Sequence, residues 1–468
     1  MCSIRHYSTA TAVSIQLARA KKKHATWSNF CTSYLETALE SVGLAIPPPT
    51  PDTDGVNWSL NTTLKATLSE FVRRTEMPLS QFAELVRGQT KDYRPNKSIE
   101  PEVLATACQG YPHLDRLLLI AREGVTVSLC KTPPVQQQPH HNHGSARERI
   151  NVLRKNVRKE QDAMRCLVVD LDVLTFWPEV RVSLFGVVDK SDGDPLTTGR
   201  TIHDLSFPDG DSINDCIGQL SLERSIYQHC DVIASEVIKV QEEHPDSEAQ
   251  LLAVDVKIAF RHVSIHSGSV YLFTCHIVED NALVIELSIF GGAISYIHGK
   301  STNQLYPEGF FRYHWVDNHV GVAVNIMSNT LNMEYSLRSA MINVLGASTI
   351  NEEKFSGWRS HLKVLGLVFD TTLKTVSMPD SKIKKAKTLV ATTYHSSSLT
   401  RTRYRSLLGS LCHVATCVRL ARSFLQQLRQ RESHFHRFQS VRVTAEMRED
   451  LVWWRHILHS PNLNGVHL

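Results

Sequence analysis

The chain has 468 residues, and its 51 Lys and Arg against 47 Asp and Glu give a formal net charge of +4. With 42% hydrophobic and 21% charged residues, the composition excludes a disordered, collagen-like or small disulfide-rich chain. No apolar run reaches the roughly 18 residues that a bilayer span needs, and no secretory signal precedes the first helical pattern. We therefore expect a cytoplasmic or nuclear protein that is neither secreted nor in contact with a membrane.

Residues 1–130 are expected to be helical. Leu64, Leu68 and Phe71 follow one another at intervals of three and four residues, the spacing of one helix face. No motif of known chemistry occurs in this region, and its role is left open. Residues 131–146 contain two adjacent prolines, three glutamines and three histidines, and this composition predicts a flexible linker.

From residue 147 onward the chain alternates between helical and strand patterns. A basic amphipathic helix is expected from Arg147 to about Met164, and helical periodicity returns beyond Met327. Strand-like segments are expected at 182–188, 201–207, 251–256 and 283–290, and a hairpin at 364–378. Mixed elements of this kind predict an α+β fold with helical flanks.

Positive charge is concentrated near the C-terminus. Residues 351–468 hold 19 Lys and Arg and 8 Asp and Glu, and the segment 381–431 holds eleven Lys and Arg without any acidic residue. A charged run is usually a solvated face, but an acid-free segment of this length favours a polyanionic partner such as nucleic acid.

Two segments far apart in the sequence carry the most informative acidic residues. The apolar run 251–256 reaches Asp255 near its end, where an aspartate is more often a turn or cap residue than a ligand. Strand-like flanks surround Asp317 and Asn318, a dipeptide that favours a tight hairpin turn. If strand and hairpin are neighbours in one sheet, Asp255 and Asp317 can face each other, and a divalent cation between them would offset their repulsion.

Asp170 and Asp172 could also be taken for a metal-binding pair. They have no third carboxylate partner that the sequence can place, so we expect them to be loop or cap residues.

Taken in order, the segments from about Arg147 to the C-terminus resemble retroelement reverse transcriptases, most closely the DIRS-like branch. The stretches that carry the resemblance are Phe185–Lys190, Gly199–Ser206, Asp255–Arg261, Phe290–Gly292 and Trp315–Asn318. The resemblance implies a right-hand polymerase with a helical N-terminal region. The implied divisions are the fingers and start of the palm at 147–254, the palm at 255–378, and a basic helical thumb or connection at 379–468.

The resemblance also implies roles for single residues. Asp255 and Asp317 match the family's metal ligands for two Mg²⁺ or Mn²⁺ ions, Asn318 stands at the adjacent catalytic position, and Lys354 matches a lysine that donates a proton to pyrophosphate. Binding of the incoming deoxynucleoside triphosphate is implied for Lys190, Arg200, Ala259, Phe260, Phe290 and Gly291. Binding of the primer and duplex is implied for Leu365, Gly366, Lys382, Lys384 and Lys385.

Asn318 is the main departure from the family pattern, because an aspartate is expected there. An amide oxygen can coordinate a cation but carries no negative charge. The sequence thus favours an RNA-directed DNA polymerase domain of a mobile element, acting on a primed RNA or DNA template, with activity weakened by Asn318. The alternative is a catalytically inactive nucleic-acid-binding remnant, and the end of the chain at Leu468 suggests a truncated or degenerate copy.

Overall fold

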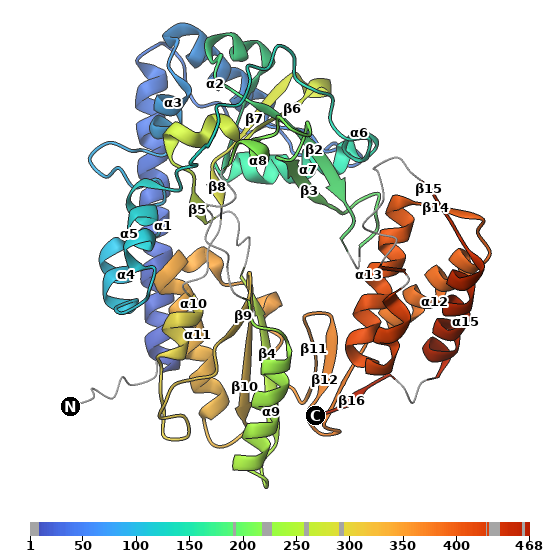
Figure 1. The fold of residues 1–468 in the computed structure, drawn as a ribbon. Helices are drawn as coiled ribbons and strands as arrows, with labels where there is room; N and C mark the ends of the chain where they lie inside the picture. The colour runs from blue at the N-terminus through green and yellow to red at the C-terminus, as the bar shows by residue number, and fades with distance from the viewer. Residues whose placement is uncertain are drawn as a thin grey trace.

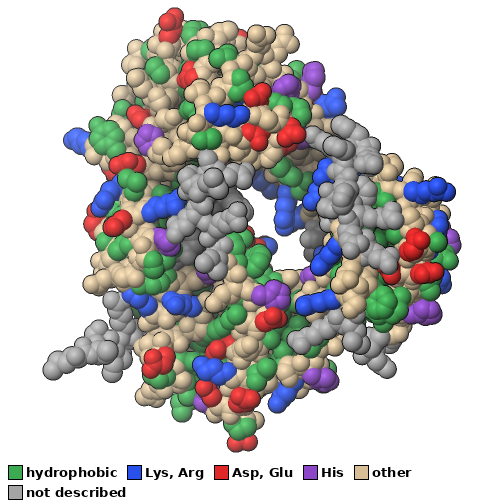
Figure 2. Space-filling view, viewed as in Figure 1, with side chains coloured by type: hydrophobic (Ala, Val, Ile, Leu, Met, Phe, Trp, Pro, Cys, Tyr) green, Lys and Arg blue, Asp and Glu red, His purple; other side chains and the backbone are tan. Residues whose placement is uncertain are grey.

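A computed structural model describes residues 9–190, 193–217, 227–256, 262–289, 294–426, 428–429, 440–460 and 464–468. A five-stranded sheet forms the upper part of the view, a three-stranded sheet the lower part, and a C-terminal group of helices lies at the right (Figure 1). These parts surround a central opening, and Lys and Arg side chains lie around it (Figure 2).

The long helix α1 (Ala10–Glu40) runs along one side of the molecule and reaches both sheet regions (Figure 1). Its 31 residues span about 46 Å at the usual rise of 1.5 Å per residue. The Thr9 side chain caps the helix by accepting a hydrogen bond from the Ala12 amide. Near this end Gln16 Nε2 donates to Asn343 Oδ1 at 2.6 Å, which joins α1 to helix α11 (Asn329–Leu345).

Four further helices complete the helical N-terminal region that the sequence predicts. They are α2 (Thr62–Thr75), α3 (Leu79–Val86), α4 (Pro101–Ala107) and α5 (Leu114–Glu123). The predicted apolar face of α2 is buried, with Leu68 and Phe71 almost inaccessible to solvent. This face packs in one core cluster with Trp177 and with strands of the upper sheet.

The upper sheet has the strand order β1-β7-β6-β2-β3, in which only β2 and β6 run parallel. Its strands are β1 (Cys166–Asp170), β2 (Val182–Val188), β3 (Arg200–Asp204), β6 (Thr274–Ile277) and β7 (Ala282–Glu286). The helices beside it are α6 (Gly144–Glu148), α7 (Ile150–Asp162) and α8 (Ile213–Cys216), and the short strands β5 (Val263–Ser264) and β8 (Ser288–Ile289) pair below it. The predicted basic helix after Arg147 is therefore present as α6 and α7.

The segment 131–146 is held against the upper sheet by hydrogen bonds. Gln136 exchanges two hydrogen bonds with the backbone of Val182, and Asn142 Nδ2 donates to the His276 carbonyl at 2.7 Å. The His143 ring lies 2.8 Å from a carboxylate oxygen of Asp204. The segment that its composition predicts to be a flexible linker therefore has specific partners on the upper sheet.

The lower sheet has the order β4-β10-β9, with β4 (Ala249–Asp255), β9 (Tyr313–Trp315) and β10 (Asn318–Val324) all antiparallel. Helices cover both of its faces, which is why β4 is apolar nearly throughout. Leu251 packs in one cluster with residues of α9 (Asp231–Glu243). Leu252 and Val254 pack in another with residues of α11, and α10 (Ile294–Gly299) contacts α11.

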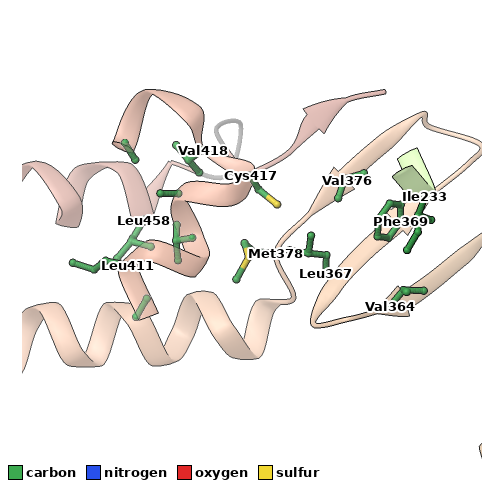
Figure 3. Packing of buried hydrophobic residues seen from close by; sticks show 14 of the residues in the cluster. Ile233, Val364, Leu367, Phe369, Val376, Met378, Leu411, Cys417, Val418 and Leu458 are labelled. Carbon is green, nitrogen blue, oxygen red and sulfur yellow. The ribbon is translucent and has the colours of Figure 1, made fainter. Parts of the chain in front are cut away.

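The C-terminal part joins a small sheet to a group of helices. The sheet consists of β11 (His361–Val364), β12 (Leu367–Asp370), β13 (Thr375–Ser377) and β16 (Val466–His467), so the predicted hairpin is a three-stranded meander with one added strand. The helices are α12 (Asp380–Tyr394), α13 (Arg401–Cys417) and α15 (Ala445–His459), with β14 (Ser398–Thr400) and β15 (Ser440–Arg442) beside them. Leu367 and Met378 lie between the sheet and the helices (Figure 3), so one core connects the two.

Within the described ranges, none of the helices is both long enough and apolar enough to cross a membrane.

Candidate functional site

The register of the lower sheet brings the two predicted acidic segments together. Asp255 at the end of β4 lies directly opposite Asn318, the first residue of β10. Directly opposed residues in an antiparallel pair project to the same face, so Asn318 lies on the same side as Asp255. The Val256 amide donates to the Asp317 carbonyl at 3.1 Å, which continues the pairing past the end of β4.

The turn before β10 is one residue earlier than the sequence predicts. Trp315 pairs with Asn318, so the two loop residues are Val316 and Asp317, and Asn318 belongs to the strand rather than to the turn. Val316 has a φ of 56°, whereas the φ of Asp317 is not positive. A positive φ at only the first of the two loop residues is typical of a type II′ turn. The prediction of an Asp317-Asn318 turn is wrong because cross-strand pairing with β4, which the local dipeptide does not reveal, fixes the register.

A branched side chain at Val316 is strained in this conformation. Glycine is the residue that usually takes a positive φ at the first position of such a turn, and β-branched residues take it rarely. Backbone strain of this kind costs about 1–3 kcal/mol and clusters at functional sites. The strained turn is what holds the Asp317 side chain beside the end of β4.

Asp317 interacts directly with Asp255. Partial burial, and next the nearby Asp255 carboxylate, raise the pKa of Asp317, while the Lys354 ammonium acts in the opposite direction. Asn318 Nδ2 also donates to Asp317 Oδ1 at 3.1 Å. The two carboxylates therefore form a close, like-charged pair across the strands.

Lys354 completes the cluster from a different element. It lies in a short 3₁₀ turn, Glu352–Lys354, and its Nζ is 2.8 Å from Asp255 Oδ2. The sequence predicts only that Lys354 donates a proton to pyrophosphate, and it does not predict the direct pairing of Lys354 with Asp255. The two positions are 99 residues apart in the sequence, so no local pattern indicates this contact.

The turn that carries Lys354 is fixed from two sides. Phe355 forms an isolated bridge with Val254 of β4, and the Arg338 guanidinium lies 3.8 Å from the centre of the Phe355 ring. Arg338 also makes two hydrogen bonds of 2.9 Å with the Glu352 carboxylate. Helix α11 thus positions Lys354 against the end of β4.

The cluster fits a divalent cation such as Mg²⁺ or Mn²⁺. Both ions prefer oxygen ligands, and Asp255 and Asp317 offer carboxylate oxygens side by side. Burial is the main cause of the raised pKa of Asp317, and a cation there would offset the second cause, repulsion by Asp255. The side chain of Asp255 is 30% exposed, so the pair is open to solvent at one side.

The two predicted triphosphate-binding residues Lys190 and Arg200 lie at one end of the upper sheet. Arg200 opens β3 and pairs with Val188 of β2, while Lys190 lies two residues beyond that strand. Both side chains are exposed. The strand pair β2–β3 is therefore formed as expected, and two exposed cations lie at the end of it where the connecting loop begins and ends.

Leu365 and Gly366 form the two-residue turn between β11 and β12. Both have positive φ, 50° and 83°, as in a type I′ turn. A side-chain carbon added at Gly366 would lie 3.3 Å from the His413 ring of α13, so the turn packs closely against that helix. Lys382, Lys384 and Lys385 are exposed in the first turns of α12.

Four predicted nucleotide-binding residues lie outside the described residues: Ala259, Phe260, Phe290 and Gly291.

Asp170 and Asp172 form ion pairs with basic side chains and do not form a metal-binding pair. Arg73 bonds both carboxylates at 2.7 Å, and Lys65 Nζ lies 2.8 Å from Asp170. Although burial opposes it, Lys65 and Arg73 lower the pKa of Asp170, and Arg73 lowers the pKa of Asp172. The pair joins α2 to the end of β1, so both residues belong to a structural ion-pair network rather than to the loop or cap role expected for them.

Comparison with known proteins finds no matching family model and no matching curated protein. Similar solved structures include the foamy viral protease-reverse transcriptase (dRH) in complex with double-stranded DNA, with 12% identity and a TM-score of 0.46 over 78% of this chain. The same enzyme in complexes with double-stranded DNA and with an RNA/DNA hybrid gives identities of 12% and 13% and TM-scores of 0.44 and 0.45. The present chain spans 60%, 71% and 46% of those three chains.

Proposed function

We propose that this chain is an RNA-directed DNA polymerase domain of a mobile element that extends a primer by metal-assisted phosphoryl transfer. The observation that carries the proposal is the close pairing of Asp255 and Asp317, placed by β4 and by a strained turn, with Lys354 beside them. Two carboxylates that repel each other, held by a turn with backbone strain, lower the stability of the fold and are typical of a functional site.

In this proposal the lower sheet with α9, α10 and α11 is the palm, the upper sheet the fingers, and the C-terminal helices the thumb. Asp255 and Asp317 hold Mg²⁺ or Mn²⁺, and the bound ions supply activation of the primer hydroxyl and neutralisation of the triphosphate. The remaining work of the protein is to position the reactants and to neutralise charge.

The exposed lysines of α12 support a role in holding a duplex. Lys382, Lys384 and Lys385 are exposed, and after Asp380 at the start of the same helix the segment 381–431 has no acidic residue. Lys and Arg side chains also surround the opening between the three parts of the molecule (Figure 2). Contacts of this kind bind the phosphate backbone without reading its sequence, and salt weakens them.

Lys190 and Arg200 are proposed to hold the triphosphate, because both are exposed cations at the loop end of one strand pair. Lys354 is proposed to give its proton to the departing pyrophosphate. Its present ion pair with Asp255 neutralises one carboxylate, and a cation bound at that carboxylate would free the ammonium for the leaving group.

Primer extension tests the proposal. Full-length protein with a primed RNA template, deoxynucleoside triphosphates and Mg²⁺ or Mn²⁺ should extend the primer, and Asp255→Asn should abolish extension. Asp246→Asn is the matched control, because Asp246 is exposed just before β4 and far from the pair. Extension that persists in Asp255→Asn would refute the proposed site.

One observation favours a second candidate, a nucleic-acid-binding protein without catalysis. Asn318 brings no negative charge, and its amide donates to one of the Asp317 oxygens. Filter binding of a primed duplex beside the extension assay separates the two candidates. Salt-sensitive binding without extension in the wild type would select the second.

A further inference from the structure

A cavity lies between α1 and the parts of the chain packed against it, away from the paired carboxylates. It has a volume of about 500 Å³, within the range of sites for small organic ligands. Its walls come from α1, the end of α3, the segment 95–98, the connection between α7 and β1, and the region of β5 and β8. We call it the α1 cavity.

Arg87 is an unusual wall residue because it is a buried cation with an unpartnered nitrogen. The residue is 7% exposed, and its Nη2 donates to the Leu287 carbonyl at 2.9 Å. Its Nη1 is buried and has no hydrogen-bond partner. A buried donor left unpaired is costly, and it indicates a partner that the chain itself does not supply.

No carboxylate forms an ion pair with Arg87 among the described residues. Glu84 is the acidic side chain that acts on it electrostatically, but Glu84 accepts a hydrogen bond of 2.6 Å from Ser267. Burial lowers the pKa of Arg87 to about 10, so the guanidinium still carries its charge at neutral pH. The Asp162 carboxylate also lines the cavity, but it is paired with Arg158 at 2.8 Å, so Arg87 is a positive charge without a counter-charge in contact.

A second cation and several apolar side chains line the same space. Lys97 is 8% exposed, and its ammonium donates to the backbone carbonyls of Asp92 and Arg94 and lies 3.8 Å from an Asp92 carboxylate oxygen. The same ammonium lies 5.9 Å from the centre of the Trp27 ring. Further apolar surface comes from Leu35, Leu64, Val86 and Leu287. One side of the cavity thus suits an anionic group and the other suits an apolar or aromatic body.

We propose that the α1 cavity binds a small organic anion, a phosphate monoester or a carboxylate, whose anionic group bonds the Arg87 guanidinium and whose apolar body packs against Trp27 and Leu287. The lining differs from that of the paired carboxylates in charge and position, so this proposal does not depend on the proposed function. The ligand also contacts α1, and α1 in turn contacts α11, the helix that packs on one face of the lower sheet. Binding should therefore stabilise the attachment of α1 as well as fill the cavity.

Isothermal titration of the full chain tests the proposal with four probes. Phenyl phosphate and benzoate carry both a charge and a ring and distinguish the two anion classes, whereas inorganic phosphate carries only the charge and phenol only the ring. We expect one of the first two to bind with one site per chain and at least tenfold more tightly than inorganic phosphate or phenol. Equal affinity for all four, or no binding of either aromatic anion at millimolar concentration, would overturn the proposal.

Two variants locate the binding site. Arg87→Met should weaken the preferred anion at least tenfold, and Arg122→Met, on the exposed face of α5, is the matched control and should bind as the wild type does. Ser28→Trp places a bulky ring at the exposed mouth of the cavity and should abolish binding while leaving Arg87 in place. Because Ser28 is exposed, this variant decides the question even if Arg87→Met does not fold. Unchanged affinity in Ser28→Trp contradicts the assignment.

Discussion

Replacing Asn318 by aspartate should lower the stability of the protein when no divalent cation is present. The same change should increase the stabilisation that a divalent cation gives. In the structure Asn318 Nδ2 lies 3.1 Å from Asp317 Oδ1, and Asn318 faces Asp255 across the strand pair. Asn318→Asp removes that hydrogen bond and adds a third carboxylate to a pair whose mutual repulsion already contributes to the raised pKa of Asp317.

Coulomb's law gives the size of both effects. Two unit charges at the observed 3.1 Å repel by about 5 kcal/mol at an effective dielectric of 20, an upper value because the site is partly open to solvent. Attraction between the new carboxylate and a cation at about 4 Å has a comparable size, about 4 kcal/mol per unit charge. That energy corresponds to a ceiling of about a thousandfold in cation affinity or in the rate of a step that depends on the cation.

Thermal unfolding with EDTA and across a Mn²⁺ titration measures both effects without relying on catalysis. Asn318→Asp should unfold at a lower temperature than the wild type in EDTA, and its unfolding temperature should respond to much lower Mn²⁺ concentrations. Asn325→Asp is the matched control, because it adds the same charge at the exposed far end of β10. If Asn318→Asp equals the wild type both in EDTA and in its Mn²⁺ midpoint, the inferred cation site is wrong.

Three further changes test other parts of the structure. Arg73→Met should lower the free energy of unfolding in urea by about 2 kcal/mol, because Asp170 and Asp172 lose a shared cation; a change below about 0.5 kcal/mol would contradict this. His298 is fully buried, and burial lowers its pKa to about 4 from an unfolded value near 6.5. The free energy of unfolding that the neutral His298 ring contributes is therefore complete above pH 6.5 and should be lost as the pH falls toward 4, by about 3 kcal/mol at most. His298→Gln should flatten the dependence of the unfolding free energy on pH in this range. Val316→Gly should leave stability unchanged or raise it by about 1 kcal/mol, since glycine accepts the positive φ without strain, and a clear loss in thermal unfolding would show that Val316 is not strained.

The elements with strong periodicity could be predicted well from the sequence. The apolar face of α2 and the apolar strand ending at Asp255 form where their patterns place them, and the strand pair beside Lys190 and Arg200 forms as the resemblance implies. The turn before β10 could not be placed correctly, because Val316 is a poor residue for a positive φ. Only pairing with β4 fixes it there.

The sequence by itself determined the α+β composition, the basic C-terminal segment and the candidate residues Asp255 and Asp317. These properties follow from residue type and short-range spacing, which a linear chain displays directly. Only the tertiary structure decided that Asp255 and Asp317 interact, that Lys354 pairs with one of them, and that Arg87 faces a cavity without a counter-charge. Contacts of that kind join positions that are far apart in the chain, so they depend on strand register and helix packing, which local patterns do not encode.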